Sequence, residues 1–321
     1  MNTAVLALGL TISLASLDAA YAQTYPNKPV RLILGPAAGG PTDAASRSVA
    51  AKLSELWGQQ VVVENRPGAG NTIATAIAAK ATPDGYTLHV CNISDSVAPA
   101  LHRNLPYVFL RDFAAISLFG TTANLLVVHP SVPVKSVQEF IAHAKASPGK
   151  LDYGTTGVGT SPHLTMELFK SMTGINVMHV PFKGAPLLYA DLIAGRVSAA
   201  FGNLPGYVDN VKAGRVRALG VSTLKRSARL PEVPTIAESG VPGFDVTVWY
   251  GLCAPTGIPR STVAKVNADM IKALDLPDLR TRLELLGVDP GSSTPEQFTA
   301  FIKSETAKWA KVVKDAGIQP Q

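Results

Sequence analysis

The sequence predicts an α/β fold of two domains that are joined by two strands. The chain has 321 residues, of which 46% are hydrophobic and 16% are charged, so it is long enough to form two compact cores. Strand-like apolar runs alternate with helical patterns along most of it, which is typical of parallel sheets with helices on both faces. Two longer apolar runs, Ile116–His129 and Phe244–Ala254, leave the first alternating unit and return to it. We therefore predict one domain of residues 23–120 and 250–321 and a second domain of residues 121–249.

Residues 1–22 are predicted to be a secretion signal that is separate from the fold. Ala4–Leu17 is an apolar run too short for a comfortable membrane span, and Ala20-Tyr21-Ala22 is a small-x-small cleavage pattern. One feature departs from the usual signal, because no Lys or Arg precedes the apolar run. On the remaining pattern we expect export to the periplasm.

The first alternating unit puts two loops at strand ends. Its loops GPAAGGPTD and NISDS each follow a strand, and ligand loops of parallel sheets lie at the carboxyl ends of strands. Thr42 or Asp43 is expected to cap the first helix. The expected strands are Val30–Leu34, Val61–Val63 and Tyr86–Cys91, and the expected helices are one with Ala45, Val49, Leu53 and Leu56 on its apolar face and one over Thr72–Ala81.

The second unit repeats this alternation, and the chain then returns to the first domain. Ser136 and Glu139 form the capping-box pattern of its first helix, and Thr294 is placed to cap the last helix of the chain. That last helix carries an apolar stripe of Phe298, Phe301, Ile302, Trp309 and Val313. The strands expected in the second unit are Leu151–Tyr153, Val177–Val180, Val197–Phe201 and Arg217–Ser222, and the helices expected on return are Ser261–Leu274, Pro277–Leu286 and one from Pro295.

The stretch Leu151–Gly174 carries the strongest functional signal. It predicts a short strand, a loop of small and hydroxyl residues, and an amphipathic helix that is opened by Pro162 and stopped by Gly174. The amides at a helix N-terminus have no intrahelical partner and lie at the positive end of the helix dipole. Such a terminus binds anions. We therefore predict that Thr155–His163 forms a carboxylate pocket in a protein that binds rather than reacts.

Charge and cysteine content limit the other classes of function. The formal net charge is +6, and it becomes +7 when residues 1–22 are removed, because that segment holds one Asp and no Lys or Arg. The densest basic set, Lys303, Lys308, Lys311 and Lys314, alternates with Glu305 and Asp315, so we interpret it as a solvated helix face and expect no nucleic-acid partner. No C-x-x-C pair or His cluster at metal-ligand spacing occurs, so no metal site is predicted.

Cys91 and Cys253 each end an apolar run. They could pair in an oxidising compartment. Because a sequence does not set the Cα separation that a bridge requires, we favour buried free thiols.

Several sequence blocks follow one another in order over nearly all of residues 23–321. The blocks are Gly39-Gly40-Pro41-Thr42-Asp43, Glu64-Asn65-Arg66-Pro67-Gly68-Ala69-Gly70, Pro83-Asp84-Gly85-Tyr86-Thr87-Leu88, Gly159-Thr160-Ser161-Pro162-His163, Val180-Pro181-Phe182-Lys183-Gly184, Asn203-Leu204-Pro205, Pro231-Glu232-Val233-Pro234-Thr235 and Trp249-Tyr250-Gly251. Together they resemble the tripartite tricarboxylate transporter receptors, the Bug-type extracytoplasmic solute receptors. The chain departs from that pattern at Ala38, where the family often has Pro, at Asn71, where it has a further Gly, and at Ala185-Pro186.

The resemblance implies a type II periplasmic-binding-protein fold, a clamshell that delivers carboxylated solutes to a membrane permease. It implies no enzymatic activity and no cofactor, and we expect a monomer. We expect hinges near Phe119–Ala123 and Val248–Gly251. Carried over by motif, the ligand-binding residues are Ala37, Ala38, Gly39, Thr42 and Ser94 from the first domain, and Thr155, Thr156, Gly157, Thr160, Ser161, His163, Phe182, Lys183 and Asn203 from the second.

Other interpretations of these residues remain open. Gly35–Gly40 lacks the G-x-G-x-x-G and G-x-x-x-x-G-K-[ST] patterns of nucleotide sites, so it is a tight turn or a ligand loop. An exported α/β enzyme acting on a small organic acid is the alternative function, but no G-x-S-x-G elbow occurs.

The individual side chains also have structural alternatives. His163 could be structural, Lys183 could be an ordinary exposed lysine, and the Arg in Asn65-Arg66-Pro67 is favoured as an anchor of a turn. Trp249 and Tyr250 could shape the cleft or pack at the hinge. Because the candidate pocket offers hydroxyls, amides and at most one cation, we expect small mono- or dicarboxylates rather than phosphorylated ligands.

Overall fold

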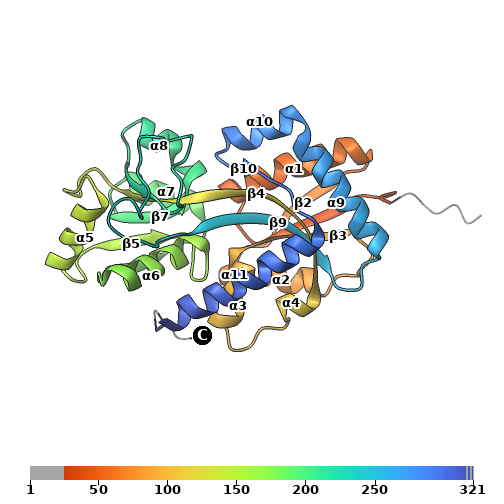
Figure 1. The fold of residues 1–321 in the computed structure, drawn as a ribbon, viewed down its shortest axis with the longest axis horizontal. Helices are drawn as coiled ribbons and strands as arrows, with labels where there is room; N and C mark the ends of the chain where they lie inside the picture. Colours follow the sequence, from red (N-terminus) through yellow and green to blue (C-terminus); the bar gives the residue numbers. More distant parts are fainter. Residues whose placement is uncertain (1–24, 316, 319, 321) are drawn as a thin grey trace, which may run out of the picture.

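One mixed sheet runs through the whole molecule (Figure 1). The computed structural model describes residues 25–315, 317, 318 and 320, so the predicted secretion signal lies outside the described residues. Along the sheet the strand order is β2-β1-β3-β9-β4-β7-β5-β6, and β8 and β10 also pair with β4. The strands are β1 (Val30–Leu34), β2 (Val61–Asn65), β3 (Thr87–Asn92), β4 (Phe113–Val128), β5 (Asp152–Thr155), β6 (Met178–Pro181), β7 (Ala199–Asn203), β8 (Arg217–Val221), β9 (Thr247–Pro255) and β10 (Asp289–Pro290).

The sheet is parallel at its two ends and antiparallel in its middle. Strand β1 pairs in parallel with β2 and β3, and β5 pairs in parallel with β6 and β7, as the strand–helix alternation predicts. The two long strands break the pattern, because β9 is antiparallel to β3 and β4, and β4 is antiparallel to β7. The prediction of a parallel sheet therefore holds within each half only. A strand that connects two domains has no crossover helix to make it parallel to its neighbours.

Helices cover both halves of the sheet, and α11 lies below the sheet beside α3 in Figure 1. The N-terminal half is covered by α1, α2, α3, α9, α10 and α11, and the other half by α5, α6, α7 and α8. The helices are α1 (Pro41–Trp57), α2 (Thr72–Ala79), α3 (Ile93–Leu101), α4 (Phe109–Asp112), α5 (Val137–Ala146), α6 (Ser161–Thr173), α7 (Ala185–Ile193), α8 (Val208–Lys212), α9 (Arg260–Asp275), α10 (Pro277–Leu285) and α11 (Pro295–Asp315), with short 3-10 turns at Ala69–Asn71 and Leu204–Gly206.

Two strands join the halves. Strand β4 pairs with β9 over its first part, up to Ala123, and with β7 and β8 from Asn124 onward. The strands β4 and β9 run side by side through the predicted hinges, where Gly120 faces Tyr250 and Thr121 faces Trp249. This is the predicted architecture of two α/β units on two connecting strands. The exact domain limits at residues 120/121 and 249/250 stay a prediction.

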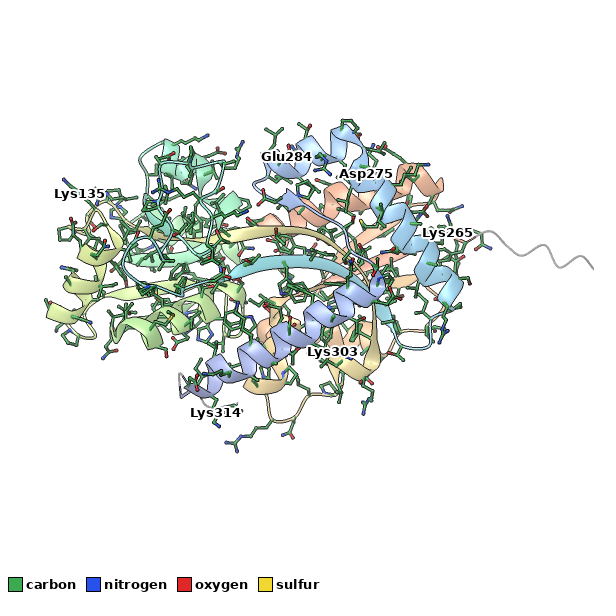
Figure 2. All side chains as sticks on the ribbon, viewed as in Figure 1. Lys135, Lys265, Asp275, Glu284, Lys303 and Lys314 are labelled. Carbon is green, nitrogen blue, oxygen red and sulfur yellow. A yellow bond between two sulfur atoms is a disulfide. The ribbon has the colours of Figure 1, made fainter. Side chains whose placement is uncertain are left out.

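The C-terminal helix is held to β9 by a buried polar contact. Glu305 Oε2 accepts hydrogen bonds from the indole nitrogens of Trp249 and Trp309, each at 3.1 Å. Phe298, Ile302 and Val313 of the predicted stripe are also buried. Of the lysines of α11, Lys303, Lys311 and Lys314 are exposed and Lys308 is half-buried, and Lys314 lies at the edge of the molecule in Figure 2. The basic residues of α11 therefore form the exposed side of a helix whose other side is packed.

The expectation of free thiols was wrong, because Cys91 and Cys253 form a disulfide with a Cα–Cα separation of 6.1 Å. The reason is the antiparallel register of β3 and β9, in which His89 faces Cys253 and Cys91 faces Gly251. The two cysteines are diagonal neighbours on adjacent strands. That separation falls in the usual range for disulfides, and only the pairing of strands far apart in sequence creates it.

Two predicted helix starts shift by one or two residues. Helix α1 begins at Pro41 with Gly40 as its N-cap, rather than being capped by Thr42 or Asp43, because Pro at the first helical position has a φ already suited to the helix. Helix α6 begins at Ser161, so Pro162 is its second residue, and Gly174 ends it at φ 69° as predicted. Thr294 caps α11 as predicted, accepting from the Gln297 amide at 3.2 Å.

Candidate functional site

A cavity of about 720 Å³ lies between the two halves of the sheet. Its first wall is formed by residues 35–37, 40–42, 67–71 and 92–94, in the loops that follow β1, β2 and β3. Its second wall is formed by residues 156–158, 160–162, 182–185 and 202–203, which follow β5, β6 and β7. Val248 and Tyr250 of β9 line it between the walls. The carboxyl ends of both sets of parallel strands thus face one another, as expected for ligand sites in α/β folds.

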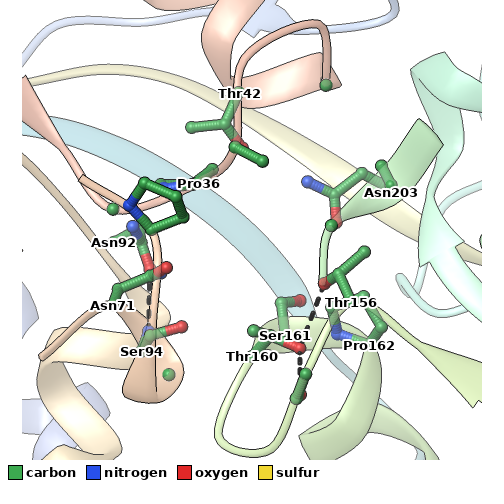
Figure 3. Close-up of a pocket in the computed structure, with 18 of the residues that line it drawn as sticks. Pro36, Thr42, Asn71, Asn92, Ser94, Thr156, Thr160, Ser161, Pro162 and Asn203 are labelled. Atoms are coloured by element: carbon green, nitrogen blue, oxygen red, sulfur yellow. Dashed lines mark hydrogen bonds between the residues drawn. The ribbon is translucent and has the colours of Figure 1, made fainter. Parts of the chain in front are cut away.

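The β5–α6 loop is held in shape by its own hydroxyls. The Thr156 hydroxyl donates to Thr160 Oγ1 at 3.2 Å, and the Thr160 hydroxyl donates to the Gly157 carbonyl at 2.7 Å (Figure 3). Thr160 is the N-cap of α6, a position where a hydroxyl usually accepts from the helix amides, yet it makes no such bond. The first amides of α6 are therefore left without a side-chain cap at the cavity.

Ser161 is oriented by a residue of the connecting strand β4. Asn124 Nδ2 donates to Ser161 Oγ at 2.7 Å and to Thr165 Oγ1 at 2.6 Å. The Thr165 hydroxyl gives its own proton to the Ser161 carbonyl at 2.8 Å, so the atom of Asn124 that faces it must be a donor. Because Ser161 Oγ accepts from Asn124, its proton is free to be donated into the cavity.

Three of the helices that begin at the cavity without a side-chain cap have a proline in their first two positions. They are α1 after Gly40, α6 after Thr160 and α7 after Gly184. Each of these N-termini presents amides with no intrahelical acceptor, together with the positive end of a helix dipole. Among the described residues that line the cavity, Lys183 is the only Lys or Arg. The site therefore provides a positive potential mainly from neutral groups, which suits a carboxylate.

The tyrosine and histidine side chains of the lining are neutral at pH 7. Burial raises the pKa of Tyr250 to about 12, and the Tyr250 hydroxyl accepts from Asn203 Nδ2 at 2.8 Å. Burial lowers the pKa of His102. The lining therefore carries no negative side chain among the described residues to repel an anion.

The two walls touch at their rims through glycines. A Cβ added at Gly70 of the first wall would lie 2.7 Å from the Val158 carbonyl oxygen of the second. A Cβ added at Gly184 would lie 2.8 Å from Cβ of Ala37. Both glycines have positive φ, 62° and 113°. Close approach of the walls thus requires glycine at both positions.

Ten of the predicted ligand residues line this cavity and four do not. Those that line it are Ala37, Thr42, Ser94, Thr156, Gly157, Thr160, Ser161, Phe182, Lys183 and Asn203. Ala38 and Gly39 are exposed outside it, at the tip of the loop. The Gly39 amide donates to Asp43 Oδ2 at 3.0 Å, so this tip is pinned to α1 rather than turned toward the cavity. Ligand contact by the ten stays a prediction.

Thr155 and His163 lie behind the second wall, in a buried polar network. The Thr155 hydroxyl is 2.7 Å from His179 Nε2, the Gly159 amide donates to His163 Nδ1 at 3.3 Å, and the two imidazole rings are 4.6 Å apart. Burial lowers the pKa of both histidines, that of His179 to about 4 with a further contribution from His163. Both rings are therefore neutral at pH 7, and they position the β5–α6 loop from the protein side.

The alternatives for single residues are partly resolved. Arg66 pairs with Glu64 at 3.0 Å, which fits the anchor interpretation. Tyr250 lines the cavity while Trp249 packs against α11, because successive residues of a strand point to opposite faces. Lys183 is exposed and also lines the cavity, so its role stays open.

Sequence reasoning missed Asn71, Asn92, Tyr189 and Tyr207 as lining residues. Asn92 ends β3 and could have been found, because it stands at the carboxyl end of a strand. Tyr189 and Tyr207 lie on α7 and just before α8, and nothing in their local pattern distinguishes them from core aromatics. Their access to the cavity depends on Gly202 and Gly206, where an added Cβ would strike Tyr207 and Tyr189 respectively.

The site does not contain the contacts of a serine hydrolase. Ser161 Oγ accepts from Asn124 and His163 Nδ1 accepts from the Gly159 amide, so each has another partner. Within the described residues there is no cluster of three or more His, Cys, Asp or Glu suited to a metal ion. In the same part of the chain, no helix combines the length and apolar character needed to cross a membrane.

Two α/β units on two connecting strands, with a cavity where their strand ends meet, define the class of periplasmic solute-binding proteins. A BugD structure described as a periplasmic binding protein superposes with a TM-score of 0.88 at 32% identity, covering 92% of this chain and 100% of that one. Residues 45–318 match the profile of the tripartite tricarboxylate transporter family receptor. The chain belongs to that family, which consists of substrate-binding receptors rather than enzymes.

Curated relatives and solved structures agree with this assignment. The chain is 34% identical to protein BugT of Bordetella pertussis over 99% of this chain and 98% of the relative. It is similar to an R. palustris protein solved with adipate, with a TM-score of 0.89, 36% identity and coverage of 92% of this chain and 100% of the other. MatC from Rhodopseudomonas palustris, solved with bound malate, has a TM-score of 0.85 and 32% identity, with coverage of 90% and 100%.

Proposed function

We propose that this protein is a periplasmic receptor that captures a small mono- or dicarboxylate in the cavity and delivers it to a tripartite tricarboxylate-type permease. The observation that carries the proposal is the convergence of three uncapped helix N-termini on a cavity with one lysine. The adipate and malate in two related structures support the same class of ligand.

The second wall binds the carboxylate in this proposal. Amides at the start of α6 and the free proton of Ser161 are directed into the cavity, and hydrogen bonds to a charged acceptor are stronger than those between neutral groups. The β5–α6 loop needs no rearrangement to offer them, because Thr156 and Thr160 already fix its shape. The residues that bind the carboxylate are Thr156, Gly157, Thr160 and Ser161, with Thr42 and Ser94 facing them across the cavity.

Titration calorimetry with a panel of straight-chain acids, their methyl esters and their phosphorylated counterparts tests the ligand class. We expect saturable one-to-one binding of acids, loss of binding on esterification and weaker binding of phosphorylated compounds. A phosphate concentrates up to two negative charges on one group, whereas each carboxylate carries one, and the described lining contains one lysine. Equal affinity for acid and ester would contradict the proposal, as would turnover of the bound acid.

The family match also supports the periplasmic location and the delivery step of this proposal. Export by residues 1–22 is tested by fractionating cells that express the whole chain, with the processed protein expected in the periplasm as a monomer. Delivery is tested by uptake of a labelled acid into cells that carry the permease subunits with and without the receptor. Uptake that does not depend on the receptor would contradict the transport role while leaving ligand binding intact.

A further inference from the structure

Asn71 stands in a backbone conformation that favours glycine. Within the described residues only Ala69 and Asn71 combine a side chain with positive φ, at 45° and 79°, and both lie in the loop after β2. Asparagine tolerates this region better than most residues but still less well than glycine. Asn71 therefore carries a side chain at a position whose backbone conformation is easier for glycine to adopt.

The Asn71 side chain is buried, faces the cavity and has no hydrogen-bond partner among the described residues. Asn71 is 8% exposed and lines the cavity. Its main chain is anchored, because its amide donates to the Gly68 carbonyl at 3.0 Å and its carbonyl accepts from Thr75 Oγ1 at 3.2 Å. Its carboxamide, by contrast, hydrogen-bonds to none of the described residues and does not cap α2. Because Asn71 lines the cavity, this unused amide can hydrogen-bond to a ligand there.

The Asn71 side chain packs directly against the main chain of Gly35, because Gly35 has no side chain to occupy that space. A Cβ added at Gly35 would lie 2.3 Å from Cβ and 2.7 Å from Oδ1 of Asn71. The Asn71 side chain therefore lies flat against the Gly35 backbone. This close packing fixes the direction of the carboxamide before a ligand arrives.

Two further buried side chains next to Asn71 offer hydrogen-bonding groups to the cavity. Asn92 Oδ1 accepts from the Ser94 amide at 2.9 Å, which leaves Asn92 Nδ2 without a partner among the described residues. The Ser94 hydroxyl likewise has none there, although Asn92 and Ser94 are only 6% and 2% exposed. In Figure 3 Asn71, Asn92 and Ser94 lie on one side of the opening, across from Thr156, Thr160 and Ser161.

We infer that Asn71, together with Asn92 and Ser94, forms a second subsite that hydrogen-bonds to an oxygen at the far end of the ligand, and that Asn71 determines specificity for that end. The inference rests on the proposed function, in which the second wall binds the carboxylate. The subsite is uncharged, since its groups are two carboxamides and a hydroxyl. An oxygen acceptor on a hydroxyl or on a second carboxylate satisfies the same donors.

The experiment compares straight-chain acids of four to six carbons that end in a methyl, a hydroxyl or a second carboxylate. Their affinities are measured by titration calorimetry for the unaltered protein and for Asn71→Gly, Asn71→Asp and Ala69→Gly. Asn71→Gly removes the amide at a position where glycine is conformationally favoured, so it should fold. Ala69→Gly is the matched control, because it gives the same loop the same freedom and removes no polar group.

We expect the unaltered protein to prefer an oxygen-ended acid to the methyl-ended acid of equal length. Asn71→Gly should reduce that preference by about fivefold for a hydroxyl and by about tenfold or more for a carboxylate, as for one neutral or one charge-assisted hydrogen bond. Affinity for the methyl-ended acid should change by less than about twofold, within the usual effect of a distant group. Asn71→Asp should lower the affinity for the carboxylate-ended acid most, because the new Asp carboxylate would then face the second carboxylate of the ligand.

The outcomes separate this inference from the proposed function. An end-group preference that survives Asn71→Gly, or that Ala69→Gly reduces equally, would overturn the inference alone. The inference alone would also be overturned if the unaltered protein bound methyl-ended and oxygen-ended acids equally well. Failure of the unaltered protein to bind any acid would overturn the proposed function and the inference together.

Discussion

The two walls of the cavity are built in different ways. The part of the second wall that we propose binds the carboxylate is one continuous loop from Thr156 to Pro162, in which the hydroxyls bond to one another and to the main chain. The first wall is assembled from three separate loops, and its buried amides at Asn71 and Asn92 include donors that no other described residue accepts from. A continuous loop whose shape is fixed by its own hydroxyls can present the α6 amides and the Ser161 proton to a constant chemical group. Donors on the three separate loops of the first wall can set the identity of the rest of the ligand.

Removing the disulfide tests whether β9 supports the first wall. Of the changes proposed here, we expect it to have the largest effect on stability. The bridge joins β3, which ends at Asn92, to β9 across 162 residues. Replacing Cys91 and Cys253 together by Ser should lower the free energy of unfolding by about 2–4 kcal/mol. Denaturant unfolding measures this, with the reduced unaltered protein as the control. If the double Ser variant were as stable as the oxidised unaltered protein, strand pairing alone would support the wall.

Holding the walls apart tests whether both must act on one ligand. Gly184→Ala places a methyl 2.8 Å from Cβ of Ala37 at a φ of 113°, and such overpacking costs about 1–3 kcal/mol. We expect affinity for all acids to fall by about tenfold or more, the factor that corresponds to 1.4 kcal/mol. Small-angle scattering should also show less compaction at saturating ligand.

Gly243→Ala is the control for this closure experiment, because Gly243 also has a positive φ, 81°, but an added Cβ there meets no atom within 4 Å. It should reduce stability slightly and leave affinity unchanged. If Gly184→Ala closed and bound like the unaltered protein, the rim contact would have no part in binding.

Ser161→Ala tests the second wall by itself. It should lower the affinity for every acid, whatever group the acid carries at its far end. The variant removes the proton that Ser161 can donate to a carboxylate and leaves the Asn124 amide partly unpaired. We expect about a tenfold loss for methyl-, hydroxyl- and carboxylate-ended acids alike, the usual size of a charge-assisted hydrogen bond. Calorimetry on the same acids measures it. A loss confined to one end group would assign Ser161 to specificity rather than to the carboxylate.

The buried histidines predict the smallest effect, a pH dependence of stability that originates behind the second wall. Burial lowers the pKa of His163, and burial together with His163 lowers that of His179 to about 4, from an ordinary value of about 6.5. The unfolded chain therefore binds more protons than the folded chain between about pH 6.5 and 4, so stability should fall as the pH falls through that window.

Thermal unfolding at several pH values measures this dependence, and His179→Asn should make the curve shallower below pH 6. Glu167 and Lys170 lie close enough to contribute with opposite signs, so the slope is that of the group of residues. An unchanged slope in His179→Asn would exclude His179 as its source.

Much of the fold was predictable because local patterns carried it. Strands β1 and β8 and the helix that ends at Gly174 lie within a residue or two of their expected places, because apolar periodicity and glycine stops act over a few residues. The antiparallel middle of the sheet was not predictable in this way. It depends on β4 and β9, which are more than a hundred residues apart and have no local signal for their direction of pairing.

The candidate site likewise has features that local sequence predicts and features that only tertiary contacts set. The amino-acid sequence by itself determined that a helix starts beside Pro162 and ends at Gly174, because proline in the first turn and a glycine stop act through local backbone geometry. Only the tertiary structure decided that Cys91 meets Cys253, that His163 lies behind the wall, and that the Asn71 amide faces the cavity. Those three outcomes depend on which distant segment occupies the adjacent space, and spacing along a chain does not specify that.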